Sequence, residues 1–319
     1  MNSSPPSPPP LPPGASAPRT SGLAIASLVL GILSLFLTIL TSIPAIICGI
    51  LALTRISSSR GQLAGRGLAI SGIVTGVLFA LLLPVVLMFI FIMMPALSRA
   101  RDVAERAACQ NNLKQMGLVL KMYANESKGE YFPQLSSEPG VLMLSLKEVY
   151  PELLLDLSTL ICPSDAQQAR MNPGPDMAFG DQSYIYFGYV ITSEDEFEAF
   201  TEVYRERVAQ GLPFDEDLEA PPGRGSMGSD RFYRLREGVE RLFVTDNTDP
   251  GAGARIQSMI PIMWDRVGSQ PGVLTFNHMP GGANVLYMDG HVEFKRYPDS
   301  WPVTRRAPEL FSELEALGD

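Results

Sequence analysis

Residues 1–94 contain no aspartate or glutamate, and their only charged side chains are four arginines, Arg19, Arg55, Arg60 and Arg66. A soluble enzyme seldom has so long a stretch without a carboxylate, so this segment is predicted to enter a membrane. All 34 acidic residues follow it, and there they outnumber the basic residues. This surplus of negative charge argues against nucleic-acid binding, which needs exposed lysine and arginine.

Two long uncharged segments carry the membrane signal. A helix over residues 20–54 would extend roughly 50 Å, against about 30 Å of hydrocarbon in a bilayer. The segment is therefore either one long, tilted span kinked at Pro44, or a span over about 23–40 followed by a shorter returning segment over about 44–53. Residues 67–98 are predicted to form a second transmembrane helix.

The loop between these segments predicts the topology. Residues 55–66 carry three arginines and no acid, which is typical of a cytoplasmic loop. One further crossing then places residues 95–319 outside the cytoplasmic membrane. The lipid bilayer is therefore an expected partner of the chain. Eight prolines among the first eighteen residues predict that the tail 1–20 is disordered and partly extended, and it is best interpreted as a spacer.

The glycine and alanine pattern of the membrane segments resembles a known bacterial module. The matching stretches are SGLAIASLVLGIL at 21–33, ICGILAL at 47–53 and GRGLAISGIVTG at 65–76. They resemble domain of unknown function 4190. The resemblance implies a small integral membrane module over residues 21–94 and assigns no chemistry to it.

The following segment resembles a second family. Apolar residues recur at helical spacing over 96–127, which predicts one amphipathic helix. The sequence of this segment resembles type II secretion pseudopilins and the pilin-like proteins of domain of unknown function 1559. The matching residues are Pro95-Ala96-Leu97, Cys109, Asn112-Leu113-Lys114-Gln115, Gly117 and Tyr123. The short glutamate-containing processing motif of those proteins is not found before the membrane helix. We therefore expect no cleavage-dependent assembly into a pilus.

The C-terminal part continues this second resemblance. Ile161-Cys162-Pro163-Ser164-Asp165 is similar to a turn of the pilin-like family, and residues 276–298 are similar to its closing H-x9-D-G signature, with one additional residue before Asp289. The matching positions of the signature are His278, Gly281, Gly282, Asn284, Asp289, Gly290, His291 and Val292. Asp289-Gly290 also predicts a two-residue hairpin turn.

These features predict a membrane α-helical module followed by an α+β, pilin-like domain over 95–306 and an acidic tail over 307–319. The long helix is expected to pack on an antiparallel sheet. The expected strands are 183–191, 242–247, 273–277, 283–288 and 291–295. Residues 142–160 read as one or two short helices, and the acidic stretch 194–219 as a solvated helix face and loop rather than a calcium site.

The cysteines and histidines are the candidates for chemistry. If the large domain is extracytoplasmic, Cys109 and Cys162 are its only cysteines, which favours a disulfide over two free thiols. The two histidines of the chain, His278 and His291, lie near Asp289 in the sequence.

These three residues, with Asp246 as a further oxygen ligand, form a weak metal candidate. We expect them to be structural instead, through a turn and hydrogen bonds. No catalytic motif and no cofactor site is expected, because neither a G-x-S-x-G nor a phosphate-binding loop occurs.

The resulting expectation is a non-enzymatic, membrane-anchored bacterial envelope protein whose extracytoplasmic domain serves assembly or binding, with other envelope or secretion-system proteins as partners. Two alternatives stay open. One is a metal-dependent sensor or hydrolase that uses His278, Asp289 and His291. The other is a minor pseudopilin of a type II secretion-like system.

Overall fold

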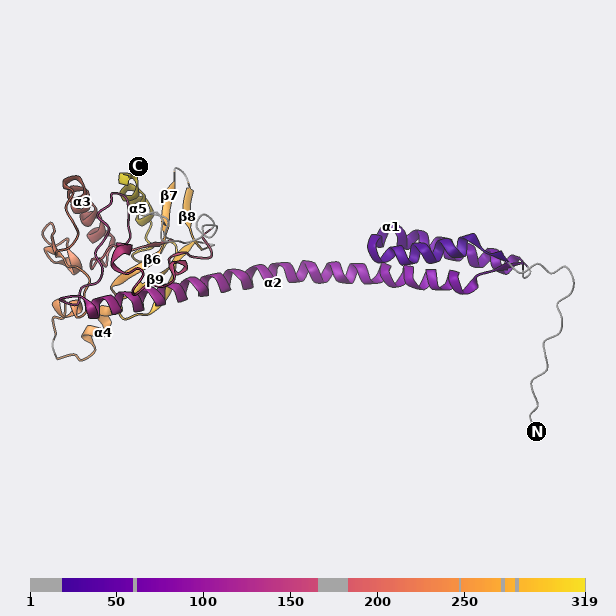
Figure 1. The fold of residues 1–319 in the computed structure, drawn as a ribbon, viewed down its shortest axis with the longest axis horizontal. Coiled ribbons are helices and arrows are strands. Elements are labelled where there is room, and N and C mark those ends of the chain that lie inside the picture. The colour runs from indigo at the N-terminus through magenta and orange to yellow at the C-terminus, as the bar shows by residue number, and fades with distance from the viewer. Residues whose placement is uncertain are drawn as a thin grey trace, which may run out of the picture. The chain divides into compact units, whose positions relative to one another are not determined.

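The computed structural model describes residues 19–59, 62–165, 183–246, 248–270, 273–278 and 281–318. The expected tail 1–20 therefore lies almost entirely outside the described residues. The chain divides into two compact units, Met1–Ser98 and Arg99–Asp319. Helix α2, Arg66–Glu126, contributes its first part to one unit and its last part to the other (Figure 1). Each unit is described by itself.

The first unit contains a helix that folds back on itself. α1 covers Gly22–Ser58, and the hydroxyl of Ser27 donates a hydrogen bond to the carbonyl oxygen of Ala45 at 3.0 Å. In a straight helix, residues 18 positions apart would be separated by about 27 Å. The two halves of α1 therefore lie side by side, as Figure 1 shows. Of the two sequence interpretations, the structure agrees with the one in which the segment folds back.

Small residues allow the helices of this unit to approach closely. A side chain on Gly72 of α2 would collide with Ser27, since a Cβ placed there lies 2.1 Å from the serine Oγ. Gly49 meets Ser27 and Ile73 in the same way. The two-residue strands β1 (Arg19–Thr20) and β2 (Leu63–Ala64) pair in parallel and hold the start of α1 beside the start of α2. Packing through small residues is characteristic of helices in membranes.

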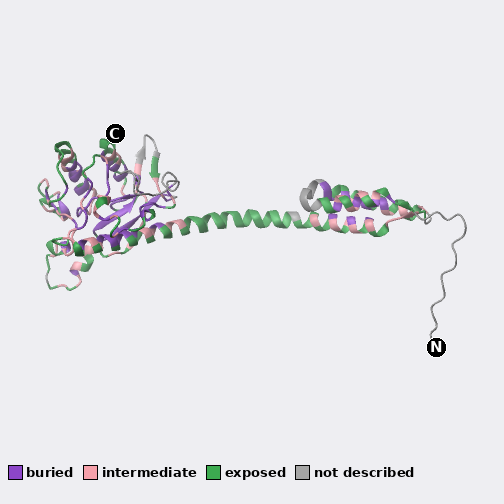
Figure 2. Cartoon of the chain, viewed as in Figure 1, coloured by how far each residue is buried: buried purple, intermediate pink, exposed green. Residues whose placement is uncertain are grey.

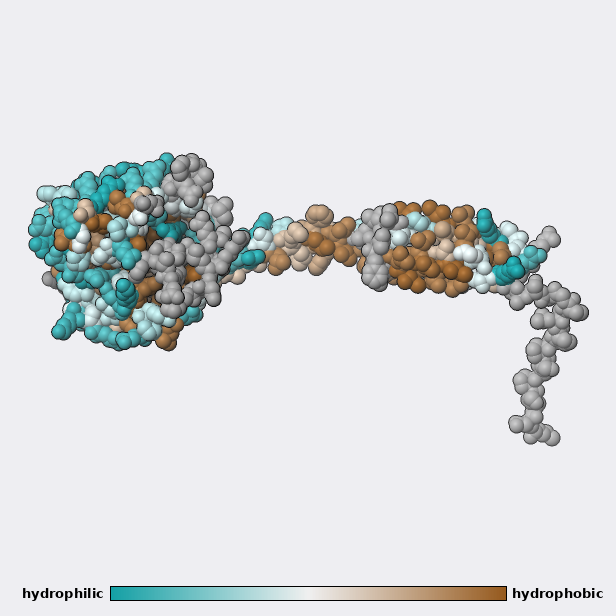
Figure 3. Space-filling model, turned by 45° about the horizontal axis from the view of Figure 1, so that its top comes forward, coloured by the Kyte–Doolittle hydropathy of each residue, from teal (hydrophilic) through white to brown (hydrophobic). Residues whose placement is uncertain are grey.

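The apolar surface of this unit is suited to lipid. The segment Thr41–Ser58 and helix α2 are both long and apolar enough to cross a membrane. The described side chains over 81–94 of α2 are exposed, including Phe91 at 75%, and Figures 2 and 3 show this stretch as exposed and hydrophobic. Exposed apolar surface on this scale indicates membrane association.

The second unit is an α+β domain built on a four-stranded antiparallel sheet. The strand order is β10 (Val292–Arg296), β9 (Gly282–Tyr287), β6 (Pro261–Asp265) and β3 (Tyr184–Ile185). Register pairs such as Glu293 with Val285 and Trp264 with Val285 align the central strands. A separate two-stranded sheet pairs β7 (Val267–Gln270) with β8 (Val273–Phe276).

The sheet has a buried core on each face. One face packs on the last part of α2, where Leu113, Met116 and Leu120 are fully buried together with Leu286 of β9. Gly117 lies between them, and a Cβ at that position would come within 3.3 Å of the Leu286 side chain. The opposite face packs on α3 (Glu194–Gln210) and α5 (Ala307–Glu315) through a cluster of aromatic rings. The predicted helix 96–127 thus occupies its expected place on a sheet.

The remaining elements are short. They are the 3-10 helices η1 (Leu146–Glu148), η2 (Leu157–Leu160), η3 (Ser226–Gly228), η4 (Val239–Leu242) and η5 (Ala316–Gly318), the short helix α4 (Ala252–Gln257), and the strand pair β4 (Leu218–Glu219) and β5 (Arg231–Phe232). The two 3-10 helices η1 and η2 occupy the stretch 142–160, for which one or two short helices were expected.

Several predicted strands need correction. Residues 242–247 form no strand over their described part, because η4 ends at Leu242 and no partner strand lies alongside. Its place in the sheet is taken by β6, which the sequence analysis did not identify. Residues 183–191 supply only the short strand β3, and 273–277 pairs outside the main sheet. The segment 307–319 is no tail over its described part, since Phe311 of α5 is fully buried in the domain core.

The hairpin between β9 and β10 also differs in detail from the prediction. Its loop has three residues rather than two, because the N–H of Tyr287 bonds to the carbonyl oxygen of His291 and the N–H of Gly290 bonds to that of Tyr287. Met288 is buried and takes up the additional position. Gly290 has a φ of 91°, as expected for the glycine of such a loop.

Candidate functional site

A disulfide joins helix α2 to the segment after η2. Cys109 and Cys162, the two cysteines named from the sequence, are bonded with a Cα–Cα distance of 5.2 Å, and both are fully buried. In the chain-entropy treatment, closing a loop with a sequence separation of 53 residues stabilises the fold by about 4 kcal/mol. Cys48, the third cysteine, is free and lies in the first unit.

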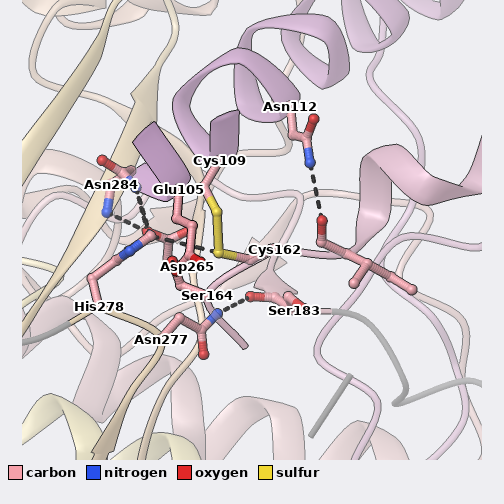
Figure 4. Close-up of a disulfide and its surroundings, with 11 residues drawn as sticks. Glu105, Cys109, Asn112, Cys162, Ser164, Ser183, Asp265, Asn277, His278 and Asn284 are labelled. Atoms are coloured by element: carbon pink, nitrogen blue, oxygen red, sulfur yellow. Dashed lines mark hydrogen bonds and ion pairs between the residues drawn. A yellow bond between two sulfur atoms is a disulfide. The ribbon is translucent and has the colours of Figure 1, made fainter. Parts of the chain in front are cut away.

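Polar contacts on either side of the disulfide attach the same two segments. The side-chain amide of Asn112, one turn after Cys109, donates to the carbonyl oxygen of Ile161 at 3.0 Å. The hydroxyl of Ser164 donates to Glu105, one turn before Cys109, at 3.3 Å. Figure 4 shows these contacts around the disulfide. One face of α2 thus holds the Cys-Pro-Ser-Asp turn at three successive points.

A buried histidine and a buried carboxylate lie against this disulfide. His278 follows β8, Asp265 ends β6, and Asn284 lies on β9; their exposed fractions are 3%, 0% and 0%. The Nε2 atom of His278 is 3.0 Å from Oδ2 of Asp265 and 3.6 Å from Sγ of Cys162. The three strands and the helix α2 therefore bring one imidazole, one carboxylate and two sulfurs together (Figure 4).

The hydrogen bonds at Asp265 are unevenly distributed between its two oxygens. Oδ2 accepts from the main-chain N–H and the side-chain amide of Asn284, both at 2.7 Å, and it lies beside His278. The side-chain nitrogen of Asn284 also lies 3.0 Å from Nε2 of His278, so this imidazole nitrogen faces a carboxylate oxygen, an amide nitrogen and a sulfur. Oδ1 of Asp265 and Oδ1 of Asn284 accept no hydrogen bond from the described residues, although both are buried.

Charge and aromatic surface surround this cluster. The guanidinium of Arg106 lies 3.9 Å from the centroid of the Phe294 ring, which in turn packs edge-on against His278. Tyr184 of β3 is also nearby, and burial, together with the carboxylate of Asp265, raises the pKa of its phenol. Among the described residues, these neighbours enclose the cluster, and the side chains of His278, Asp265 and Asn284 are at most 3% exposed.

The second histidine occupies a different place. His291 and Asp289 pair in the exposed β9–β10 loop, with 2.6 Å between Nδ1 and Oδ1, and the imidazole stacks on Tyr287. Among the described residues, the group of potential metal ligands that lie within 4.8 Å of one another consists of Cys109, Cys162, Asp265 and His278. The structure therefore does not bring His278 together with Asp289 and His291.

The other sequence candidates lie on the surface. Asp246 is exposed and accepts hydrogen bonds from the N–H and hydroxyl of Thr248. In the acidic stretch 194–219, α3 begins with Glu196 bonded back to Thr192, and burial raises the pKa of the Glu196 carboxyl. The helix ends at Gly211, whose φ of 67° is typical of a helix terminus.

Asp265 and its contact with the disulfide were missed by the sequence analysis. The available signal was weak: Asp265 is the first charged residue after the apolar run IPIMW over 260–264. Its role depends on the pairing of β6 with β9, which places it opposite Asn284. The signature positions Gly281 and Gly282 have positive φ values of 121° and 150°, so they shape the chain between His278 and β9.

Comparison with known proteins identifies one part of the chain. Residues 23–87 match the family model described as Domain of unknown function (DUF4190). This part of the chain is thus similar to DUF4190, as its glycine and alanine pattern indicated. No curated protein and no solved structure matches the chain. The cluster around Cys109 lies outside the matched residues.

Proposed function

We propose that the chain is a non-enzymatic, membrane-anchored bacterial envelope protein, and that its second unit is an extracytoplasmic, pilin-like domain for assembly or binding. The observation that carries the proposal is helix α2. It contains the most apolar segment of the described chain, and its last part packs a buried stripe on an antiparallel sheet. A long helix that is apolar first and amphipathic later is the arrangement expected of pilin-like proteins.

The disulfide supports the proposed side of the membrane. Cys109 and Cys162 are bonded to each other, and stable disulfides belong to oxidising compartments such as the space outside the cytoplasmic membrane. The arginines of the first unit support the same orientation, because Arg55 and Arg66 flank the connection between α1 and α2 and Arg19 lies beside that connection through the β1–β2 pair.

The separation of the histidines favours this function over a hydrolase or metal sensor based on His278, Asp289 and His291. His278 is buried beside Asp265 and Asn284, whereas Asp289 and His291 are in an exposed loop. A role as a minor pseudopilin shares the same fold, and the identity of the neighbouring genes would separate it from a more general envelope role.

Labelling with a membrane-impermeant maleimide tests the orientation. Two exposed serines offer matched positions: Ser57 near the end of α1 and Ser137 in the second unit. In a Cys48→Ser background, intact spheroplasts should label Ser137→Cys and leave Ser57→Cys unlabelled, while lysed cells should label both. Labelling of Ser57→Cys alone in intact spheroplasts would reverse the orientation and remove the envelope function.

Cross-linking tests the assembly or binding role. An amine- and thiol-reactive cross-linker applied to membranes that contain Ser137→Cys should give products larger than the single chain. If the chain stays monomeric with every length of cross-linker, the result would contradict a role in assembly or binding.

A further inference from the structure

We infer that reduction of the Cys109–Cys162 disulfide creates a buried zinc site whose ligands are the two cysteine thiolates, a carboxylate oxygen of Asp265 and Nε2 of His278. The inference concerns a ligand set different from the one suggested by the sequence, and it does not depend on the proposed function. It begins from the four candidate ligand atoms, which all lie within 4.8 Å of one another in the interior of the second unit.

The distances suit a tetrahedral metal ion. With bonds of about 2.0–2.3 Å from zinc to nitrogen, oxygen and sulfur, the ligand atoms of a tetrahedron are separated by roughly 3.3–3.8 Å. His278 Nε2 is already 3.6 Å from Cys162 Sγ and 3.0 Å from Asp265 Oδ2. Loss of the Sγ–Sγ bond lets the two sulfurs separate toward the same spacing.

The chemistry of the four ligands selects zinc. Two thiolates, one imidazole and one carboxylate are ligands that Zn²⁺ accepts together, whereas Ca²⁺ and Mg²⁺ require mostly oxygen ligands. Two thiolates and a carboxylate in one buried place would repel each other strongly, and a divalent cation offsets most of that charge. The neutral imidazole completes four ligands without adding charge.

Asn284 is placed to support such a site. Its main-chain N–H and side-chain amide both donate to Oδ2 of Asp265, which fixes the orientation of the carboxylate. Donors of this kind commonly orient a metal-binding carboxylate from behind. Oδ1 of Asp265 accepts no hydrogen bond from the described residues despite full burial. The carboxylate therefore has one oxygen beside His278 Nε2 and a second oxygen without a partner, and a cation among the four ligand atoms can take either.

The disulfide makes the site dependent on redox state. A dithiol reductant gives two electrons and two protons to the disulfide, its own sulfurs become a disulfide, and the Cys109–Cys162 bond breaks into two thiols. Zinc binding then releases those two protons and forms two sulfur–zinc bonds, because the thiolate is the ligand. The oxidised chain retains only Asp265 and His278 and is expected to hold no zinc.

The test measures zinc in the full-length chain in detergent. The chain is reduced with dithiothreitol in mild denaturant, desalted without oxygen, refolded with zinc sulfate and desalted again, and bound zinc is determined by mass spectrometry. We expect about one zinc per reduced chain and less than a tenth of that in the oxidised chain. Zinc should also slow the alkylation of Cys109 and Cys162 at least tenfold, and a chelator should restore the faster alkylation rate.

Variants assign the ligands. Asp265→Asn and His278→Ala should each weaken zinc binding at least tenfold, and Cys109→Ser with Cys162→Ser should abolish it. The matched control is His291→Ala, since His291 forms the other histidine–aspartate pair of the chain, on the surface, and it should bind zinc like the unaltered chain. Cobalt in place of zinc should give the absorption of a tetrahedral thiolate complex in the unaltered chain and lose it in His278→Ala.

Four results would overturn the inference. The first is that the reduced chain retains no more zinc than the double serine variant, and the second is that the oxidised chain retains as much zinc as the reduced chain. The third is that His278→Ala and Asp265→Asn both leave the zinc affinity unchanged. The fourth is that the reduced chain stays unfolded when zinc is present. Near-ultraviolet circular dichroism of the same samples identifies the last result. It also excludes misfolding as the reason that a variant loses zinc.

Discussion

Replacement of Leu113 by alanine gives the most direct test of how the second unit is held together. Leu113 is fully buried on the face of α2 that packs against the sheet. Its loss removes the apolar surface of three carbon atoms from the core and leaves a cavity that the surrounding helix and sheet can only partly fill. Fully buried leucines replaced by alanine usually cost about 2–5 kcal/mol.

The same helix offers a matched control. Leu118 is 64% exposed and lies five residues later, so Leu118→Ala makes the identical chemical change without opening a core cavity. We expect this control to change the free energy of unfolding by no more than about 0.5 kcal/mol. The difference between the two variants therefore isolates the packing of α2 on the sheet from the helix propensity of alanine.

The assay follows unfolding of the full-length oxidised chain in detergent through its near-ultraviolet circular dichroism. Both tryptophans, Trp264 and Trp301, lie in the second unit, so the signal reports on that unit. For a domain of about this size, a loss of 3 kcal/mol lowers the melting temperature by roughly 6–12 °C. If Leu113→Ala melts with Leu118→Ala and the unaltered chain, the helix does not contribute to the core as argued.

Three further outcomes are expected. Peptide mapping without reductant should recover Cys109 linked to Cys162, and alkylation of both thiols in untreated extracted protein would contradict this pairing. Gly290→Val should destabilise the second unit by about 1–2 kcal/mol and Gly290→Asn by less, as measured by denaturant unfolding, because a side chain at φ 91° is strained although no atom lies within 4 Å of the added Cβ. Burial, with the hydrogen bond to Glu148, raises the pKa of Tyr123 to about 12. Since the phenol of the unfolded chain ionises near 10, the free energy of unfolding should fall as pH rises from about 10 to 12. Tyr123→Phe should lack this part of the decline.

The helices and the last hairpin were accessible from the sequence because their signals are local. The apolar stripe through Leu113 and Leu120 repeats with the period of a helix, and the residues around Asp289 and Gly290 alternate on both sides of a turn. The long uncharged segments indicated membrane helices through composition alone. Whether α1 folded back was open, because it depends on contacts such as Ser27 with Ala45 that no local pattern encodes.

The sheet order was less accessible because it depends on distant partners. The run LFVTD over 242–246 has the composition of a strand but finds no neighbour, whereas PIMWD at Pro261–Asp265 begins with proline and still becomes a central strand. Pairing with β9 on one side and β3 on the other satisfies its backbone. The site followed the same pattern: Cys109, Cys162 and His278 were named separately, and Asp265 was not named at all.

The arrangement of these residues suggests why so many of the family-like motif positions are polar or small. Cys109, Asn112 and Gly117 are spaced along one face of α2, where they respectively form the disulfide, hold the segment before Cys162 and allow β9 to come close. Asn284 reaches the same place from the sheet and orients Asp265. The motif positions thus lie at the contact between helix α2 and the sheet. Because one of the bonds at this contact is a disulfide that reduction can open, the contact has two chemically distinct states. In the reduced state, the charge of the thiolates must be balanced by protons or by a metal ion.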